Sequence, residues 1–131
     1  MTRIAFVTDD HLTISAHFGR AAYYDVFTIE NGKVIARETR SKPSHNLFAN
    51  EPHEEPGYQH GRGPAAESRH ARMVGAISDC QVLVARGMGM GAFDNLKGNG
   101  IQPILTDIQG IDKAIDAYLT GDLVDNPERL H

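Results

Sequence analysis

The chain has 131 residues, the size of one domain, and its hydrophobic fraction of 40% and charged fraction of 23% are those of an ordinary globular protein. The formal net charge is −4, so nucleic acid is excluded as the expected partner. A single cysteine, Cys80, and an N-terminus without an apolar leader predict a cytoplasmic protein. Every apolar run falls far short of the roughly 20 residues that cross a bilayer, so no membrane partner is expected.

The first forty residues predict a central strand followed by a hairpin. Ile4–Val7 is a short apolar run closed by the polar residues 8–10, as in a buried strand that ends in a loop. Tyr23–Ile29 and Lys33–Thr39 flank Asn31-Gly32, a pair that favours a two-residue type I′ turn. Charged residues in the second arm indicate an edge strand.

The next segment changes composition and predicts a long flexible loop. Residues 41–63 are rich in Pro, His, Glu, Asn and Gly. His45, His53 and His60 lie in it, but their spacing matches no closed zinc motif, and a solvated loop is the favoured interpretation. After Gly63-Pro64, apolar residues at helical spacing predict a helix up to Ile77.

The second half predicts two strand–helix units and a polar tail. The expected strands are Val82–Ala85 and Gln102–Leu105. The expected helices run through Ala92–Leu96 and Ile111–Leu119, the second ending at Gly121. Residues 122–131 are polar and are expected to fray.

This order of elements predicts an α/β fold with a mixed sheet covered by helices. Ligands in such folds bind at the carboxyl ends of the parallel strands. In this chain those ends carry residues 8–20, 86–91 and 106–110. These three loops are therefore the candidate positions for functional residues.

The first candidate is the segment Ser15–Arg20, with the sequence Ser-Ala-His-Phe-Gly-Arg. A neutral imidazole can ligate a metal, while a guanidinium and a hydroxyl donate hydrogen bonds to an anionic ligand. The alternative is an ordinary loop with a surface histidine and an arginine that pairs with a neighbour such as Asp9 or Asp25.

The second candidate is the turn Arg86–Gly91, with glycines at 87, 89 and 91. Glycines let backbone amides approach an anion, and a helix start presents free N–H groups. The spacing matches neither a P-loop nor the dinucleotide fingerprint, so nucleotide binding is not indicated. The alternative is a tight strand-to-helix turn in which Met88 and Met90 pack. Cys80 is expected to be a buried packing residue as well.

His17-Phe18-Gly19-Arg20 and Gly87-Met88-Gly89, taken together, resemble the dinitrogenase iron-molybdenum cofactor biosynthesis family. Further segments resemble the family in the same order: the opening strand with Thr8-Asp9-Asp10, Asn31–Val34, Asp79–Val84 and Ile115–Gly121. The resemblance covers nearly the whole chain apart from residues 41–63 and the tail. Where many relatives have Gly-Gly before Met-Gly, this chain has Arg86-Gly87.

The resemblance implies a ribonuclease H-like three-layer α/β/α fold with a mixed five-stranded sheet. It implies one domain over residues 1–121, a flexible loop at 41–63 and a tail at 122–131. It further implies a non-catalytic protein that binds or carries the iron-molybdenum cofactor or a related molybdenum, iron or copper sulfide cluster, exchanged with a cluster donor or acceptor protein. His17 is the expected metal ligand. The expected cofactor-binding set is Ser15, His17, Arg20, Arg86, Gly87, Met88 and Gly89.

Two other functions share these features. A regulatory or interaction module would use the same loops for a small anion or a partner protein without a cluster. A metal-dependent nuclease would use Asp9 and Asp10 to begin a Mg²⁺ site, but the neighbouring strand end, Ala85-Arg86-Gly87, offers no carboxylate. We expect no nuclease activity.

Overall fold

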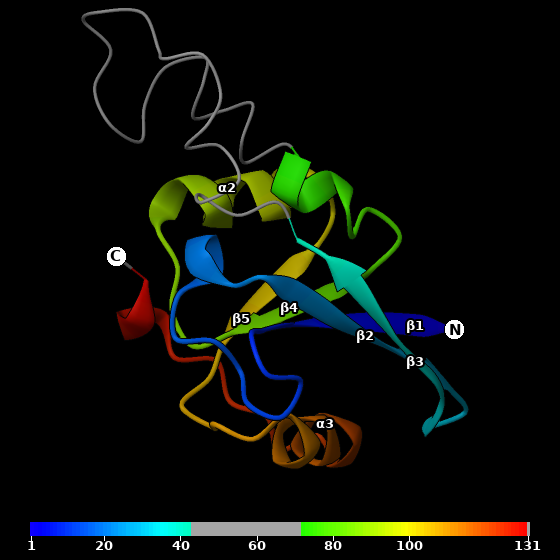
Figure 1. Cartoon of the computed structure of the whole chain (residues 1–131). Helices are drawn as coiled ribbons and strands as arrows, with labels where there is room; N and C mark the ends of the chain where they lie inside the picture. The colour runs from blue at the N-terminus through cyan, green and yellow to red at the C-terminus, as the bar shows by residue number, and fades with distance from the viewer. Residues whose placement is uncertain (43–71, 131) are drawn as a thin grey trace, which may run out of the picture.

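The computed structural model describes residues 1–42 and 72–130, and its central feature is a five-stranded mixed sheet (Figure 1). The strands, in chain order, are β1 (Thr2–Thr8), β2 (Tyr23–Glu30), β3 (Lys33–Ser41), β4 (Val82–Ala85) and β5 (Gln102–Leu105). Their spatial order is β3-β2-β1-β4-β5. The pairs β1–β4 and β4–β5 are parallel, whereas β1–β2 and β2–β3 are antiparallel. The predicted mixed α/β sheet is confirmed.

The hairpin has the expected turn. Asn31 and Gly32 have φ angles of 53° and 74°, the left-handed pair that a type I′ turn requires. The strand β3 lies at the edge of the sheet and is exposed along most of its length, as its charges indicated. It extends to Ser41, and Lys42 is buried, so the expected loop begins later than position 41. The remainder of that loop, from residue 43, lies outside the described residues.

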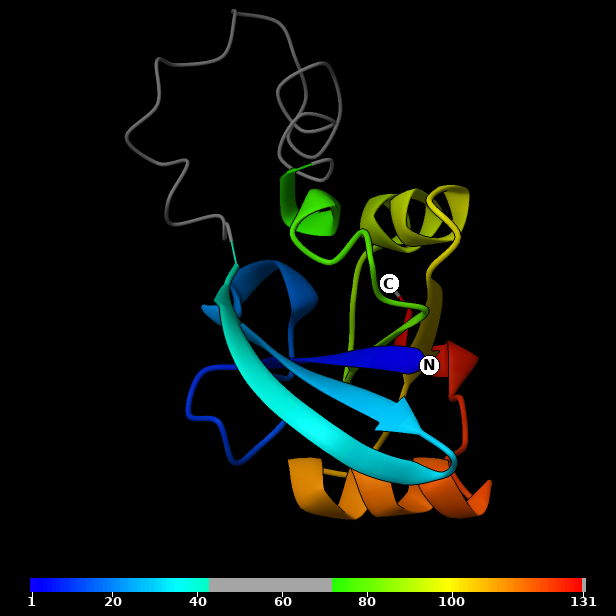
Figure 2. The same cartoon turned by 90° about the vertical axis from the view of Figure 1, so that its right-hand side faces the viewer.

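Two helices lie on opposite faces of the sheet (Figures 1 and 2). They are α2 (Met90–Gly98) and α3 (Ile111–Thr120). The predicted apolar stripe of helix α3 packs on the core: Ile111, Ala114 and Ile115 are buried, and Tyr118 and Leu119 are partly buried. The helix ends at Gly121, whose φ of 80° is the left-handed cap that glycine adopts without strain. The helix expected up to Ile77 is described only from residue 72, where residues 72–75 are helical. No described helix is long and apolar enough to span a membrane.

The C-terminal segment packs against the sheet, although its polar composition predicted fraying. The backbone N–H of Asn126 donates to the Leu105 carbonyl at 2.7 Å, and Leu130 forms a β-bridge with Met88. Between them, Pro127–Arg129 form a short 3-10 helix, η2. These backbone hydrogen bonds are independent of side-chain polarity, so composition could not indicate them.

Candidate functional site

The candidate site lies at the edge of the sheet where β1, β4 and β5 end. Because these strands run parallel, the loops that follow them meet at the same edge, which Figure 1 shows on the side of the sheet away from the N-terminus. The loop after β1 spans residues 9–22, the turn after β4 spans residues 86–89, and the loop after β5 spans residues 106–110. All three predicted segments therefore share this edge.

The loop after β1 is fastened to its own strand and to the start of α3. The Ser15 N–H donates to the Val7 carbonyl at 2.8 Å, so the chain folds back on β1. The Ile14 N–H donates to the Gln109 carbonyl at 2.7 Å. The Ile111 N–H donates to the Leu12 carbonyl at 3.0 Å. This loop is thus held on one side by the loop after β5.

On its other side the same loop is bonded to the turn after β4. The Phe18 N–H donates to the Gly87 carbonyl at 3.0 Å, and the Arg86 N–H donates to the Ser15 carbonyl at 3.3 Å. The two segments that the sequence singled out, 71 positions apart between Ser15 and Arg86, are therefore neighbours in space. The loop after β1 and the turn after β4 therefore form one surface.

His17 is an exposed residue of the loop after β1. It precedes the 3-10 helix η1 (Phe18–Arg20), and the Arg20 N–H donates to the His17 carbonyl at 3.2 Å. The Ser15 hydroxyl donates to the same carbonyl at 3.2 Å and accepts from the His17 N–H at 3.4 Å. The Ser15 side chain thus fixes the backbone that carries the imidazole and has a positioning role.

Phe18 anchors this segment in the core, beside a buried lysine. The Phe18 ring is buried, and Nζ of Lys42 lies 4.6 Å from its centroid. Burial lowers the pKa of Lys42 to about 8, against the opposing influence of the Asp9 carboxylate. Lys42 therefore packs against the residue that follows His17.

The turn after β4 is largely buried. Gly87 is buried and its carbonyl accepts from Phe18, and Met88 is 1% exposed and packs in the core, whereas Arg86 and Gly89 on either side are half-buried. Gly89 precedes α2 and provides no side-chain cap for the start of the helix. The first turn of α2 contains no acidic residue. The positive end of the helix dipole is therefore left without an anionic partner from the helix's own first turn.

The arginines of the strands and those of the site differ in their partners. Each strand arginine forms an ion pair with a carboxylate: Arg3 with Asp79, Arg37 with Asp25, and Arg40 with Glu38 and Asp79. Within residues 1–42 and 72–130, no carboxylate pairs with the arginines at this edge, which are Arg20, Arg86 and Arg129. The expectation that Arg20 pairs with Asp9 or Asp25 is not met, because Asp9 accepts from the Ala22 N–H and Asp25 binds Arg37.

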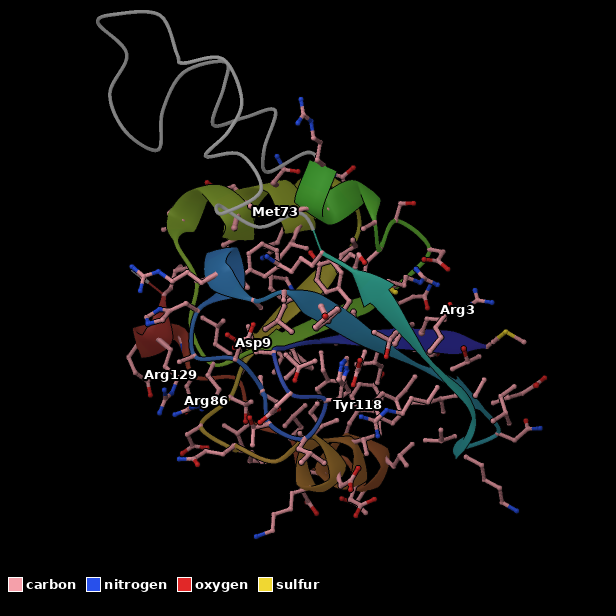
Figure 3. All side chains as sticks on the ribbon, viewed as in Figure 1. Arg3, Asp9, Met73, Arg86, Tyr118 and Arg129 are labelled. Atoms are coloured by element: carbon pink, nitrogen blue, oxygen red, sulfur yellow. The ribbon has the colours of Figure 1, made fainter. Side chains whose placement is uncertain are left out.

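Arg129 was missed by sequence reasoning because the tail was expected to fray. Its Nη1 lies 3.4 Å from the Arg86 carbonyl oxygen, and Figure 3 shows the two labelled side chains at the same end of the molecule. The Nε atom of Arg86 is buried and has no hydrogen-bond partner among the described residues. Leu123 and Leu130, two apolar residues of the tail that pack against the core, were the sequence signals for this packing.

A second cluster that the sequence did not reveal surrounds Asp25. Its fully buried carboxylate accepts hydrogen bonds from Arg37 at 2.8 Å and from His11 and Thr39 at 2.9 Å each. Burial alone would raise the pKa of Asp25, but these hydrogen bonds outweigh burial and hold it below the usual value. His11 has a φ of 64°, an uncommon backbone conformation for a residue other than glycine. Because all three partners saturate the carboxylate, this cluster fixes the loop after β1.

The acidic pair after β1 is hydrogen-bonded to backbone N–H groups of its own loop. The Asp10 carboxylate accepts from the N–H groups of Thr13 at 2.7 Å and Leu12 at 3.0 Å, and these bonds lower the pKa of Asp10 to about 2. Asp9 is engaged with the Ala22 N–H at 2.9 Å. Among the residues that the structure describes, no three His, Cys, Asp or Glu side chains are grouped to hold a metal ion. The nuclease interpretation has no carboxylate cluster in this part of the chain.

Cys80 lies at the opposite end of β4 from the site. It precedes the strand, whereas Arg86 follows it, and its side chain is 3% exposed. Burial raises the pKa of the Cys80 thiol to about 12, with the Asp79 carboxylate adding to the effect. A buried, protonated thiol at the wrong end of the strand is a packing residue.

The arrangement thus combines exposed His17, arginines that no carboxylate of the described residues pairs with, and a helix start without an acidic residue in its first turn. Comparison with solved structures finds the same fold in several proteins. Three of these are the apo orange protein of Desulfovibrio gigas (20% identity, TM-score 0.67, 96% of this chain and 93% of that chain covered), a putative NifB protein from Thermotoga (24%, 0.60, 95% and 93%) and a putative dinitrogenase from Methanocaldococcus jannaschii (11%, 0.62, 95% and 93%). At these identities the likeness establishes the fold alone.

No curated protein matches the chain. A family model described as dinitrogenase iron-molybdenum cofactor matches residues 1–121, which include β1 to α3 and both loops of the site. Since that match spans nearly the whole sequence, the chain belongs to the dinitrogenase iron-molybdenum cofactor family.

Proposed function

We propose that this protein binds a preformed anionic metal–sulfur cluster, either the iron-molybdenum cofactor or a related molybdenum, iron or copper sulfide, and carries it without catalysing a reaction. Membership of the family supports a role connected with this cofactor. The observation that carries the proposal is the pair of backbone hydrogen bonds that join Ser15–Phe18 to Arg86–Gly87. These bonds hold the backbone segment that carries His17 beside the turn that begins at Arg86.

The donor set suits an anionic cluster better than a bare metal cation. A metal cation needs several carboxylate, thiolate or imidazole ligands, and the described residues bring no three of them together. A sulfide cluster already carries its own ligands and a negative charge. It needs hydrogen-bond donors and positive charge, which Arg20, Arg86 and the start of α2 supply.

A small number of protein ligands also suits transfer. In this proposal His17 provides one metal–nitrogen bond, and every other contact is a hydrogen bond or a charge interaction. The cysteine thiolates that hold permanent iron–sulfur clusters are not available at this edge, because Cys80 is buried at the far end of β4. We place the protein in the cytoplasm, where a cluster donor and an acceptor protein would be its partners.

The experiment is anaerobic reconstitution with tetrathiomolybdate plus copper and, separately, with isolated iron-molybdenum cofactor. Metal content and visible absorption are measured after removal of unbound metal. His17→Ala should lower uptake by about 10-fold or more, the size of loss that supporting groups at metal sites already show. Arg20→Ala should lower it less, and its effect should shrink as salt concentration rises, because it removes a charge interaction.

His11→Ala is the matched control, since it removes an imidazole from the same loop but from the Asp25 cluster. It should reduce stability and keep uptake at temperatures where the variant is folded. Equal uptake by His17→Ala and wild type would remove the ligand assignment. No uptake by wild type would favour a regulatory or interaction module that uses the same loops without a cluster.

A further inference from the structure

We infer that the C-terminal segment is part of the binding site, and that Arg129 and Arg86 together bind one end of the anionic cluster. This inference rests on the proposed function and extends it to a residue beyond the part of the chain that the family model matches, which ends at residue 121. The ligand class is a sulfide- or oxide-bearing molybdenum dianion, or the equivalent face of a larger cluster.

Backbone contacts, and not its side chain, fix the position of Arg129. The bridge between Leu130 and Met88 and the hydrogen bond from Asn126 to the Leu105 carbonyl hold the residues on both sides of it. The N–H of Leu105 in turn donates to the Asp125 carboxylate at 2.9 Å. Arg129 is therefore fixed at the ends of β4 and β5 whether or not its guanidinium has a partner.

Neither Arg129 nor Arg86 has a carboxylate partner in the described part of the chain. One nitrogen of Arg129 lies at the Arg86 backbone carbonyl, which is a neutral acceptor, and among the described residues the buried Nε of Arg86 has no hydrogen-bond partner. An unsatisfied buried N–H is unfavourable, and an anion bound by both arginines supplies the missing negative charge.

The arginine pair adjoins the candidate site. The Arg86 N–H donates to the carbonyl of Ser15, two residues before His17, so an anion held by both arginines lies at the edge of the same surface. Planar guanidinium groups each offer two parallel donors, which suits oxygen or sulfur atoms on one tetrahedral centre. His17 and the arginine pair then contact different parts of one ligand.

The test measures binding of tetrathiomolybdate and, separately, molybdate by equilibrium dialysis with molybdenum analysis. Arg129→Gln should weaken tetrathiomolybdate binding about tenfold, the effect of one hydrogen bond to a charged group. Arg129→Lys, which keeps the charge but loses the planar pair of donors, should fall between that variant and wild type. Lys113→Gln is the control, because it removes one positive charge from an exposed position on α3.

Thermal unfolding of each variant without anion separates binding from folding. Wild type and Arg129→Gln should unfold at similar temperatures alone, and added anion should raise the midpoint of wild type more. Arg129→Gln binding as tightly as wild type would overturn this inference and leave the proposed function standing. Molybdate binding that depends on Arg129, in a wild type that takes up no metal–sulfur cluster, would support the arginine pair and overturn the proposed function. No binding of either anion by wild type would overturn the inference.

Discussion

Asp25→Asn tests whether the buried carboxylate holds the loop after β1 in place. The carboxylate has no exposed surface, one oxygen accepts from Arg37, and the other accepts from His11 and Thr39. An asparagine of the same shape can turn its NH₂ group toward His11 and Thr39, which can accept, but it carries no negative charge, so the charge-assisted hydrogen bond from Arg37 is lost. Loss of a hydrogen bond to a charged group costs about 1.5–3 kcal/mol.

The exposure of the partners sets the upper bound. The Arg37 and His11 side chains are 38% and 42% exposed, so water can solvate them in the variant. The loss should therefore stay below the roughly 3–5 kcal/mol of a wholly buried pair. We expect the free energy of unfolding to fall by about 2–3 kcal/mol, which lowers the unfolding temperature by about 8–12 °C for a domain of this size.

Urea unfolding followed by circular dichroism measures this change. Asp112→Asn is the control, because Asp112 faces the same Arg37 at 3.8 Å but is 88% exposed. Its effect should stay below about 0.5 kcal/mol, as for surface ion pairs in general. If Asp25→Asn costs no more than Asp112→Asn, the hydrogen-bond network does not stabilise the loop and the reasoning fails.

Three further predictions concern titration and thiol chemistry. Wild type should lose stability as the pH falls from about 4 to 2, because Arg40 lowers the pKa of Asp79 to about 2 in the folded protein. The urea midpoint of Arg40→Gln should therefore vary less than that of wild type over this range. Between about pH 8 and 10 wild type should gain stability relative to Lys42→Met, because the folded protein releases the lysine proton in this range while the unfolded chain keeps it. Calorimetry at several pH values measures this, and a difference in stability that does not change with pH would count against it. The native Cys80 thiol should react slowly with iodoacetamide, whereas fast labelling relative to the urea-unfolded chain would show that it is accessible.

Elements with local signals were predictable from the sequence. Val82–Ala85 and Gln102–Leu105 are strands with the predicted bounds, and the Asn31-Gly32 turn has the predicted conformation. Glycine, apolar runs and helical spacing act over a few residues, so they can be read along the chain. The ordered set of short motifs also indicated the family, which the match over residues 1–121 confirms.

Which polar groups become neighbours depends on how the chain folds in three dimensions. Asp25 in the middle of a buried strand has the unremarkable sequence setting Tyr-Asp-Val, and only the hairpin register and the folded loop bring Arg37 and His11 to it. Arg129 similarly comes from a polar tail that local composition indicated would fray. Pairing across long sequence separations depends on backbone hydrogen bonds and strand order, which composition and periodicity do not encode. For this reason the sequence could identify the loops of the candidate site. Only the fold shows that its arginines have no carboxylate partner among the described residues.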